Sequence, residues 1–241
     1  MKLPGKLELT RIIWLALLLA ALLALVQGRW SLLFVSLATL ALSMLPIFFA
    51  ERFSIILPPS ITAFIAVFVV AAIFLGEYFD FYDRYWWWDI ALHASSSLGF
   101  GLVGFLFVFM VFQGDRYAAP PIFVAFMSFC FAMTIGALWE IFEFSMDQIF
   151  GTNMQKSGLM DTMGDLIVDV FGAFVGAFVG FLFLKGREVG GLVWFIHDFL
   201  RENSRLYRKL DWPKPGAARD GQIGTGRKRG ERGDSGSDSP F

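Results

Sequence analysis

Long apolar segments recur along most of this chain. A hydrocarbon core of about 30 Å needs about 20 apolar residues per helix, and six segments meet that requirement. The chain is 56% hydrophobic, with a mean hydropathy of +0.62 and no basic face, which excludes a water-soluble globule and a nucleic-acid-binding protein. We therefore predict an all-α, polytopic membrane helix bundle with spans at about 12–26, 30–50, 55–76, 90–112, 121–150 and 161–184.

The first of these spans has a second interpretation. Lys2, Lys6 and Arg11 precede 15 apolar residues, a pattern that also suits a cleaved signal peptide. No clean small-x-small cleavage site precedes Gln27, so we favour a retained span.

The distribution of basic residues predicts the orientation. Lys and Arg concentrate on the cytoplasmic side of membrane proteins. If both termini lie inside, seventeen of the 20 Lys and Arg fall on that side, and three fall in outer loops: Arg29, Arg84 and Lys156. We predict an N-in, C-in protein of a bacterial or archaeal cytoplasmic membrane.

Three regions follow from these patterns. Residues 1–184 form the six-helix transmembrane domain. Residues 185–210 are predicted to include a basic amphipathic helix that either lies on anionic lipid of the inner leaflet or is an ordinary solvated helix. Residues 211–241 are rich in Gly, Arg, Asp, Ser and Pro, and such a composition predicts disorder.

Carboxylates interrupt the apolar pattern in the second half of the chain. Seven lie in or at the ends of predicted helices, and ionised at the bilayer centre they would cost about 3 kcal/mol each, or roughly 20 kcal/mol together. That exceeds the net stability of about 5–15 kcal/mol expected for a fold. The carboxylates must therefore lie near an interface, share an interior site, bind cations or hold protons.

Spacing favours a shared interior. The acids and one histidine recur every three or four residues, which puts each set on one helical face. The sets are Asp89 and His93; Glu140, Glu143 and Asp147; and Asp161, Asp165 and Asp169. The predicted topology brings all three sets to the outer leaflet. The alternative is that these carboxylates are merely interfacial or cap helix N-termini.

Small residues continue the same helical faces toward the membrane centre. Such residues let helix backbones approach closely in lipid. We predict packing along glycines at six positions: Gly101, Gly104, Gly136, Gly172, Gly176 and Gly180.

The predicted site lies within 77–172. Oxygen ligands with almost no His or Cys suit hard divalent cations, so we expect Mg²⁺, Mn²⁺ or Ca²⁺, with Zn²⁺ or Fe less favoured. The expected metal ligands are Asp89, His93, Glu140, Glu143, Asp161, Asp165 and Asp169. The residues expected at the rim of the site, some of them as phosphate contacts, are Glu77, Asp80, Asp83, Arg84, Asp147 and Lys156. The aromatic residues of 78–88 are expected to anchor the outer loop at headgroup level.

Three motifs resemble those of a known family. They are YDRYWWWDIALH, WEIFEF and GTNMQKSGLMDTMGDLIVDVFGA. The chain resembles the YjdF-like bacterial inner-membrane proteins and, more distantly, the VanZ-like proteins. The resemblance covers about 82–180, and its motif positions here are Asp89, His93, Glu140, Glu143, Asp161, Thr162, Asp165, Asp169 and Gly172. It supports the location of the site, and the VanZ-like part implies a loose link to glycopeptide resistance of the cell envelope.

Three functions remain open from the sequence. The leading one is a protein that binds a divalent cation and acts on a lipid or lipid-linked envelope molecule. The second is a proton- or cation-coupled transporter, since crowded carboxylates bind protons readily. The third is a structural membrane protein without a small ligand. No nucleophile stands out, so the sequence does not decide whether the protein is an enzyme.

Overall fold

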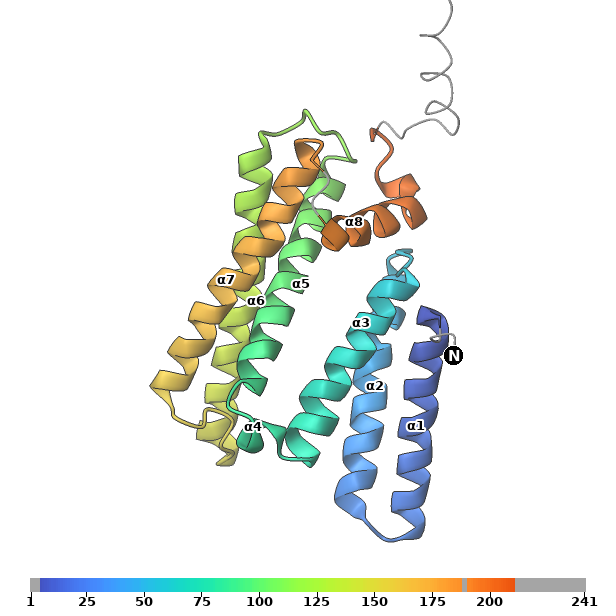
Figure 1. The fold of residues 1–241 in the computed structure, drawn as a ribbon, viewed down its shortest axis with the longest axis vertical. Coiled ribbons are helices and arrows are strands. Elements are labelled where there is room, and N and C mark those ends of the chain that lie inside the picture. The colour runs from blue at the N-terminus through green and yellow to red at the C-terminus, as the bar shows by residue number, and fades with distance from the viewer. Residues whose placement is uncertain (1–4, 188–189, 211–241) are drawn as a thin grey trace, which may run out of the picture. The chain divides into compact units, whose positions relative to one another are not determined.

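The computed structural model describes residues 5–187 and 190–210. All regular structure in these residues is helical, and six helical segments are long and apolar enough to cross a membrane. They are α1 (Lys6–Val26), α2 (Trp30–Arg52), α3 (Pro59–Val69) with its continuation η1 (Val70–Tyr78), α5 (Trp88–Val111), α6 (Pro121–Phe150) and α7 (Leu159–Leu184) (Figure 1). The predicted all-α bundle with six spans is confirmed.

Local sequence explains several helix boundaries. Pro59 and Pro121 stand at the first positions of α3 and α6, where a missing N–H costs nothing. Gly151 ends α6 with a φ of 66°, a backbone conformation that glycine adopts without strain. The third span contains a departure from the predicted α-helix, because its second half, η1, is wound as a π-helix. Such segments are rare and often lie near functional sites.

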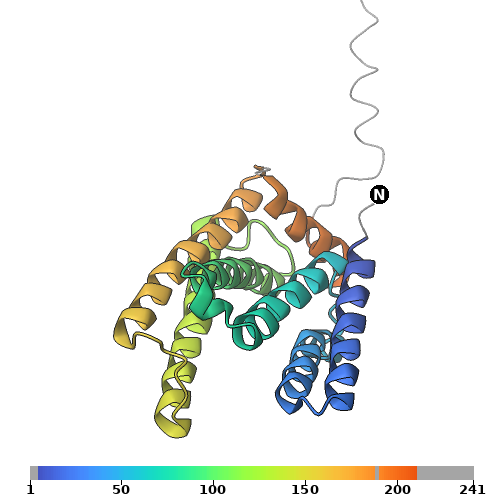
Figure 2. The same cartoon turned by 60° about the horizontal axis from the view of Figure 1, so that its bottom comes forward.

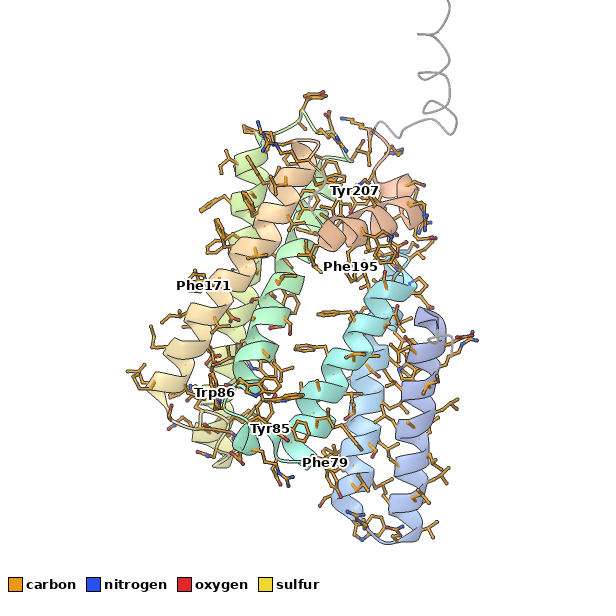
Figure 3. The ribbon with its side chains drawn as sticks, viewed as in Figure 1. Phe79, Tyr85, Trp86, Phe171, Phe195 and Tyr207 are labelled. Atoms are coloured by element: carbon orange, nitrogen blue, oxygen red, sulfur yellow. The ribbon has the colours of Figure 1, made fainter. Side chains whose placement is uncertain are left out.

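The spans form two neighbouring groups. Helices α1, α2 and α3 with η1 pack together, and α5, α6 and α7 form the second group. Large apolar side chains on the outside of both groups are exposed, among them Phe34 at 73% and Phe171 at 68% (Figure 3). Exposed apolar side chains of this kind are expected where helices face lipid.

Glycines set the distance between α5 and α7. A methyl group at Gly176 would lie 2.5 Å from the carbonyl oxygen of Leu98, and one at Gly101 would lie 3.0 Å from that of Ala173. Only residues without a side chain permit this approach. Beyond the glycines, toward the end of α5, the seam is filled by aromatic rings, with Phe105 stacked on Phe109 and edge-on to Phe183.

Helix α8 (Gly190–Glu202) runs from the end of α7 toward the start of α3 (Figures 1 and 2). Its side chains Val193, Ile196 and Leu200 are almost fully buried within the protein. The Asn203 side chain bonds both backbone groups of Ile56, with distances of 2.7 Å to its N and 2.7 Å to its O.

The segment after α7 was predicted to include a basic amphipathic helix that either lies on anionic lipid of the inner leaflet or is an ordinary solvated helix. Its apolar side instead packs against the protein, and the α-helix ends at Glu202, directly before Asn203, which bonds Ile56. Tyr207 is buried as well and donates a hydrogen bond to the Leu106 carbonyl at 2.9 Å, and this burial raises the pKa of Tyr207. Contact with anionic lipid stays a prediction for the exposed bases at and after the end of α8, Arg201, Arg205 and Arg208. The predicted disorder of 211–241 lies outside the described residues.

Candidate metal centre

Three helices bring acidic residues to one end of the second group. Helix α5 begins there, α6 ends there and α7 begins there, and we call this the acidic end (Figure 1). The short helix α4 (Phe81–Arg84) lies at the same end and leads into α5. Tyr85 and Trp86 extend from this region, and Trp86 is 82% exposed (Figure 3).

His93 lies at the centre of the acidic residues. Its Nδ1 is 3.3 Å from Oδ1 of Asp169 on α7, within hydrogen-bonding distance. Its Nε2 is 3.8 Å from Oδ1 of Asp89, one turn earlier on α5, and 3.9 Å from Oε1 of Glu140 on α6. One imidazole therefore faces carboxylates from all three helices.

Asp165 completes the group. One ligand atom each from Asp89, His93 and Asp165 lies within 4.8 Å of the other two. Two ligands of one ion are at most about 4.2 Å apart when each bond is about 2.1 Å long. Small side-chain rotations that move these ligand atoms by several tenths of an ångström would bring all three to bonding distance of one ion.

Burial separates the inner acids from the rim. Asp169 is 1% exposed, Glu140 is 4% and Asp165 is 5%, whereas the Asp89 side chain is 35% exposed. The group therefore begins at the surface with Asp89 and extends inward along α7. We define the centre cluster as Asp89, His93, Glu140, Asp165 and Asp169.

Two members of the centre cluster have oxygens without hydrogen bonds. Among the described residues, neither carboxylate oxygen of Glu140 has a hydrogen-bond partner within 3.5 Å, although the Thr162 hydroxyl interacts with this carboxylate. The second oxygen of Asp169, Oδ2, is also without a partner. A buried, unpaired charged group costs several kcal/mol. These oxygens could therefore serve as ligands of a cation.

Two predicted metal ligands lie outside the centre cluster. Glu143 accepts a hydrogen bond from the Trp139 indole at 2.9 Å, one turn apart on the exposed side of α6. Asp161 accepts one from the Lys156 backbone N–H at 3.1 Å, so it helps to fix the loop before α7. Neither is within the group of ligand atoms described above.

The predicted rim residues form their own contacts. The carboxylate of Asp147 accepts bonds from Thr152 Oγ1 at 2.6 Å and from the N–H groups of Met154 and Gln155 at 2.7 and 2.9 Å. Asp147 therefore holds the α6–α7 loop together. Arg84 lies 3.7 Å from Asp80, and Glu77 ends the third span close enough to Lys156 for electrostatic attraction.

Lys156 connects the α6–α7 loop to α4. Its ammonium group lies 2.5 Å from Oδ1 of Asp83 and 5.3 Å from the centre of the Tyr82 ring. Burial, together with the charges of Asp89 and Glu77, raises the pKa of Tyr82, so its phenol stays neutral. Both rim bases predicted as phosphate contacts are therefore paired with carboxylates.

Sequence reasoning missed two contacts of the site and the π-helix beside it. Gln155 donates a hydrogen bond to Thr162, which interacts with Glu140. Tyr82 packs against Gly76 of η1 so closely that a side chain there would overlap its ring. The seven-residue separation of Gln155 and Thr162 carries no recognised signal, and no sequence pattern indicates a π-helix.

Comparison with known proteins places the chain in a family. An uncharacterised protein of Thermotoga maritima is 30% identical over 113 residues, which are 47% of this chain and 57% of that protein. The aligned region thus spans little more than half of that relative. No solved structure matches the chain. The VanZ-like resemblance is not supported by these comparisons, whereas YjdF-like proteins belong to the family that matches residues 9–186. The chain belongs to DUF2238, a family of predicted membrane proteins.

Proposed function

We propose that this membrane protein binds one divalent cation in the centre cluster. The observation that carries the proposal is the pairing of His93 with buried carboxylates, one of which, Glu140, has no hydrogen bond to either oxygen. Asp89, Glu140 and Asp165 would supply oxygen ligands, and His93 would supply Nε2. A cation would balance the charges whose burial is otherwise costly.

Asp169 fits the role of a positioning residue. Metal-binding histidines usually pair their second ring nitrogen with a carboxylate or carbonyl, which fixes the tautomer and ring orientation. The 3.3 Å contact between His93 Nδ1 and Asp169 leaves Nε2 directed at Asp89 and Glu140. This contact would hold the ring in the orientation needed for metal binding by Nε2.

The combination of carboxylates with one imidazole favours Mn²⁺ among the expected cations. Ca²⁺ and Mg²⁺ prefer oxygen ligands alone, whereas imidazole suits transition metals. Three carboxylates with one imidazole fit Mn²⁺ best, with Zn²⁺ as its main competitor.

We infer that the cation acts on an anionic group of a lipid or lipid-linked molecule. Aromatic side chains settle at the level of lipid headgroups. Trp86 is 82% exposed, Trp87 45% and Tyr85 41%, all directly before α5. Asp89, the most exposed member of the centre cluster, lies two residues after Trp87. In the N-in, C-in orientation this end faces outward, toward the cell envelope.

Transport is less well supported than binding. A carrier needs a polar route from the site to the other side of the membrane. Between α5 and α7 the described residues beyond the centre cluster are packed glycines and alanines and then buried Phe105 and Phe109. Ser97 in this seam bonds a carbonyl of its own helix, that of His93, at 2.7 Å.

The test compares matched glutamine substitutions one turn apart on α6. The full chain is purified in detergent, stripped with a chelator and titrated with Mn²⁺, Zn²⁺, Mg²⁺ and Ca²⁺ while Tm is measured. We expect Mn²⁺ at 100 times its Kd to stabilise the wild type by about 2.7 kcal/mol. For a chain of this size, 1 kcal/mol shifts Tm by about 2–4 °C.

The two variants should behave differently. Glu140→Gln should be at least as stable as the wild type without metal, because a buried charge without a hydrogen bond is removed, and should lose most of the metal-induced rise. Glu143→Gln should follow the wild type in both conditions, since Glu143 lies outside the centre cluster. The proposal fails if no cation raises the wild-type Tm, or if Glu143→Gln loses as much of the rise as Glu140→Gln.

A further inference from the structure

A cavity of about 320 Å³ lies between α1, α2 and η1. This volume falls in the range of about 300–1,000 Å³ that is usual for small-ligand pockets. Leu23, Leu32, Phe74 and Phe79 form apolar walls, and Arg29 is at its edge. The cavity lies where Phe79 is labelled, beside the lower end of α2 (Figure 3). Helix α4 lies at the same end of the protein (Figure 1). We call it the Arg29 cavity.

The cavity opens toward lipid. Leu23 is 50% exposed and Phe79 is 41% exposed, so two of its apolar walls continue onto the outer surface of the bundle. An apolar surface of this kind at the edge of a membrane-spanning helix is expected to contact acyl chains.

The charge of Arg29 is the second observation. Three bases among the described residues lie in the predicted outer loops, and of these Arg84 pairs with Asp80 and Lys156 pairs with Asp83. Arg29 has no ion pair among the described residues and donates a hydrogen bond to the Tyr78 hydroxyl. This end of the protein has a surplus of acids, yet none of them neutralises this guanidinium.

A guanidinium without an ion pair, beside an apolar cavity, suits a ligand that has both a phosphate group and an apolar part. Arginine binds phosphate oxygens through two parallel N–H groups, and its weak hydration suits an interfacial position. Helix α2 also begins here without a side-chain cap, and the N-terminal end of a helix favours anions. A phosphate alone would leave the apolar walls unused, whereas a lipid would use both parts.

We propose that the Arg29 cavity binds an anionic phospholipid. Its phosphate contacts the guanidinium of Arg29, and one acyl chain lies against Leu23, Phe74 and Phe79. The cavity shares no residue with the centre cluster, so this lipid site is independent of the proposed cation.

The test measures lipid binding to the purified full chain by native mass spectrometry. Phosphatidylglycerol is titrated against the wild type, Arg29→Gln and Arg84→Gln. We expect Arg29→Gln to weaken phosphatidylglycerol binding about tenfold, the effect of losing one charge-assisted contact of about 1.4 kcal/mol. Arg84→Gln removes a base at the same end that is already paired, and should stay within about twofold of the wild type.

Further arms separate the contributions of charge and cavity. Ala20→Phe keeps Arg29 but fills part of the cavity, and should weaken phosphatidylglycerol binding as well. Glycerol phosphate, which lacks acyl chains, should not compete. Equal binding by wild type and Arg29→Gln would overturn the proposal, as would an equal loss in Arg84→Gln, unchanged binding in Ala20→Phe or full competition by glycerol phosphate.

Discussion

Gly176→Ala tests whether backbone contact between α5 and α7 sets the stability of the second helix group. The new methyl group would lie 2.5 Å from the Leu98 carbonyl oxygen, 3.0 Å from the Gly101 Cα and 3.1 Å from the Leu102 N. All three neighbours are backbone atoms, so no side chain can rotate away. Since ordinary van der Waals contact begins near 3.4 Å, the two helices must separate by up to 0.9 Å, the difference from the shortest of these distances.

Two effects of opposite sign act on the free energy of unfolding. Replacing glycine by alanine inside a helix stabilises it by about 0.5–1 kcal/mol. Overpacking of a close contact costs about 1–3 kcal/mol. We therefore expect a net destabilisation of up to about 2 kcal/mol, with the packing cost as the larger effect.

Gly164→Ala provides the matched control, because Gly164 lies on the same helix and a methyl group there would meet nothing within 4 Å. It should stabilise α7 by about 0.5–1 kcal/mol. Both variants are unfolded by heat in detergent and followed by circular dichroism. The reasoning is refuted if Gly176→Ala stabilises the protein as much as Gly164→Ala does.

Three further predictions concern the termini and loops. Asn203→Ala leaves the backbone groups of Ile56 unpaired and should cost about 1–3 kcal/mol of unfolding free energy, with faster amide hydrogen exchange at Ile56; unchanged exchange would contradict it. Asp147→Ala removes three hydrogen bonds, so exchange in the α6–α7 loop should rise while that of α5 stays constant. In a variant without the native cysteine, a membrane-impermeant maleimide added to intact cells should label Trp86→Cys and leave Tyr117→Cys unlabelled; the reverse pattern would invert the proposed orientation.

Hydrophobicity and length made the membrane spans predictable. A helix in lipid satisfies its own backbone, so an apolar run of sufficient length specifies a span almost without regard to its partners. The fifth span was predicted at 121–150 and found at Pro121–Phe150. The π-helical half of the third span was not predictable, because its hydrogen bonds depend on contacts such as that between Gly76 and Tyr82, which belong to different segments.

Spacing was less informative about which acids share a site. Glu140 and Glu143 are three residues apart on one face of α6, yet Glu140 is buried opposite His93 whereas Glu143 bonds Trp139 on the exposed side. Helical periodicity defines a face to within about one residue, and a boundary between protein and lipid can divide that face. Only the positions of α5 and α7 determine on which side of the boundary each carboxylate falls.

The glycines and the centre cluster depend on each other. A side chain at position 136 would overlap the carboxylate of Asp169, and Asp169 is the group that orients His93. Gly136 thus provides space for a buried acid, in addition to allowing α6 and α7 to approach. Close packing removes water from that acid and from Glu140, which raises the cost of their charges. Because packing alone would favour apolar residues at such positions, buried carboxylates there support the proposed cation, which would offset the cost of their charges.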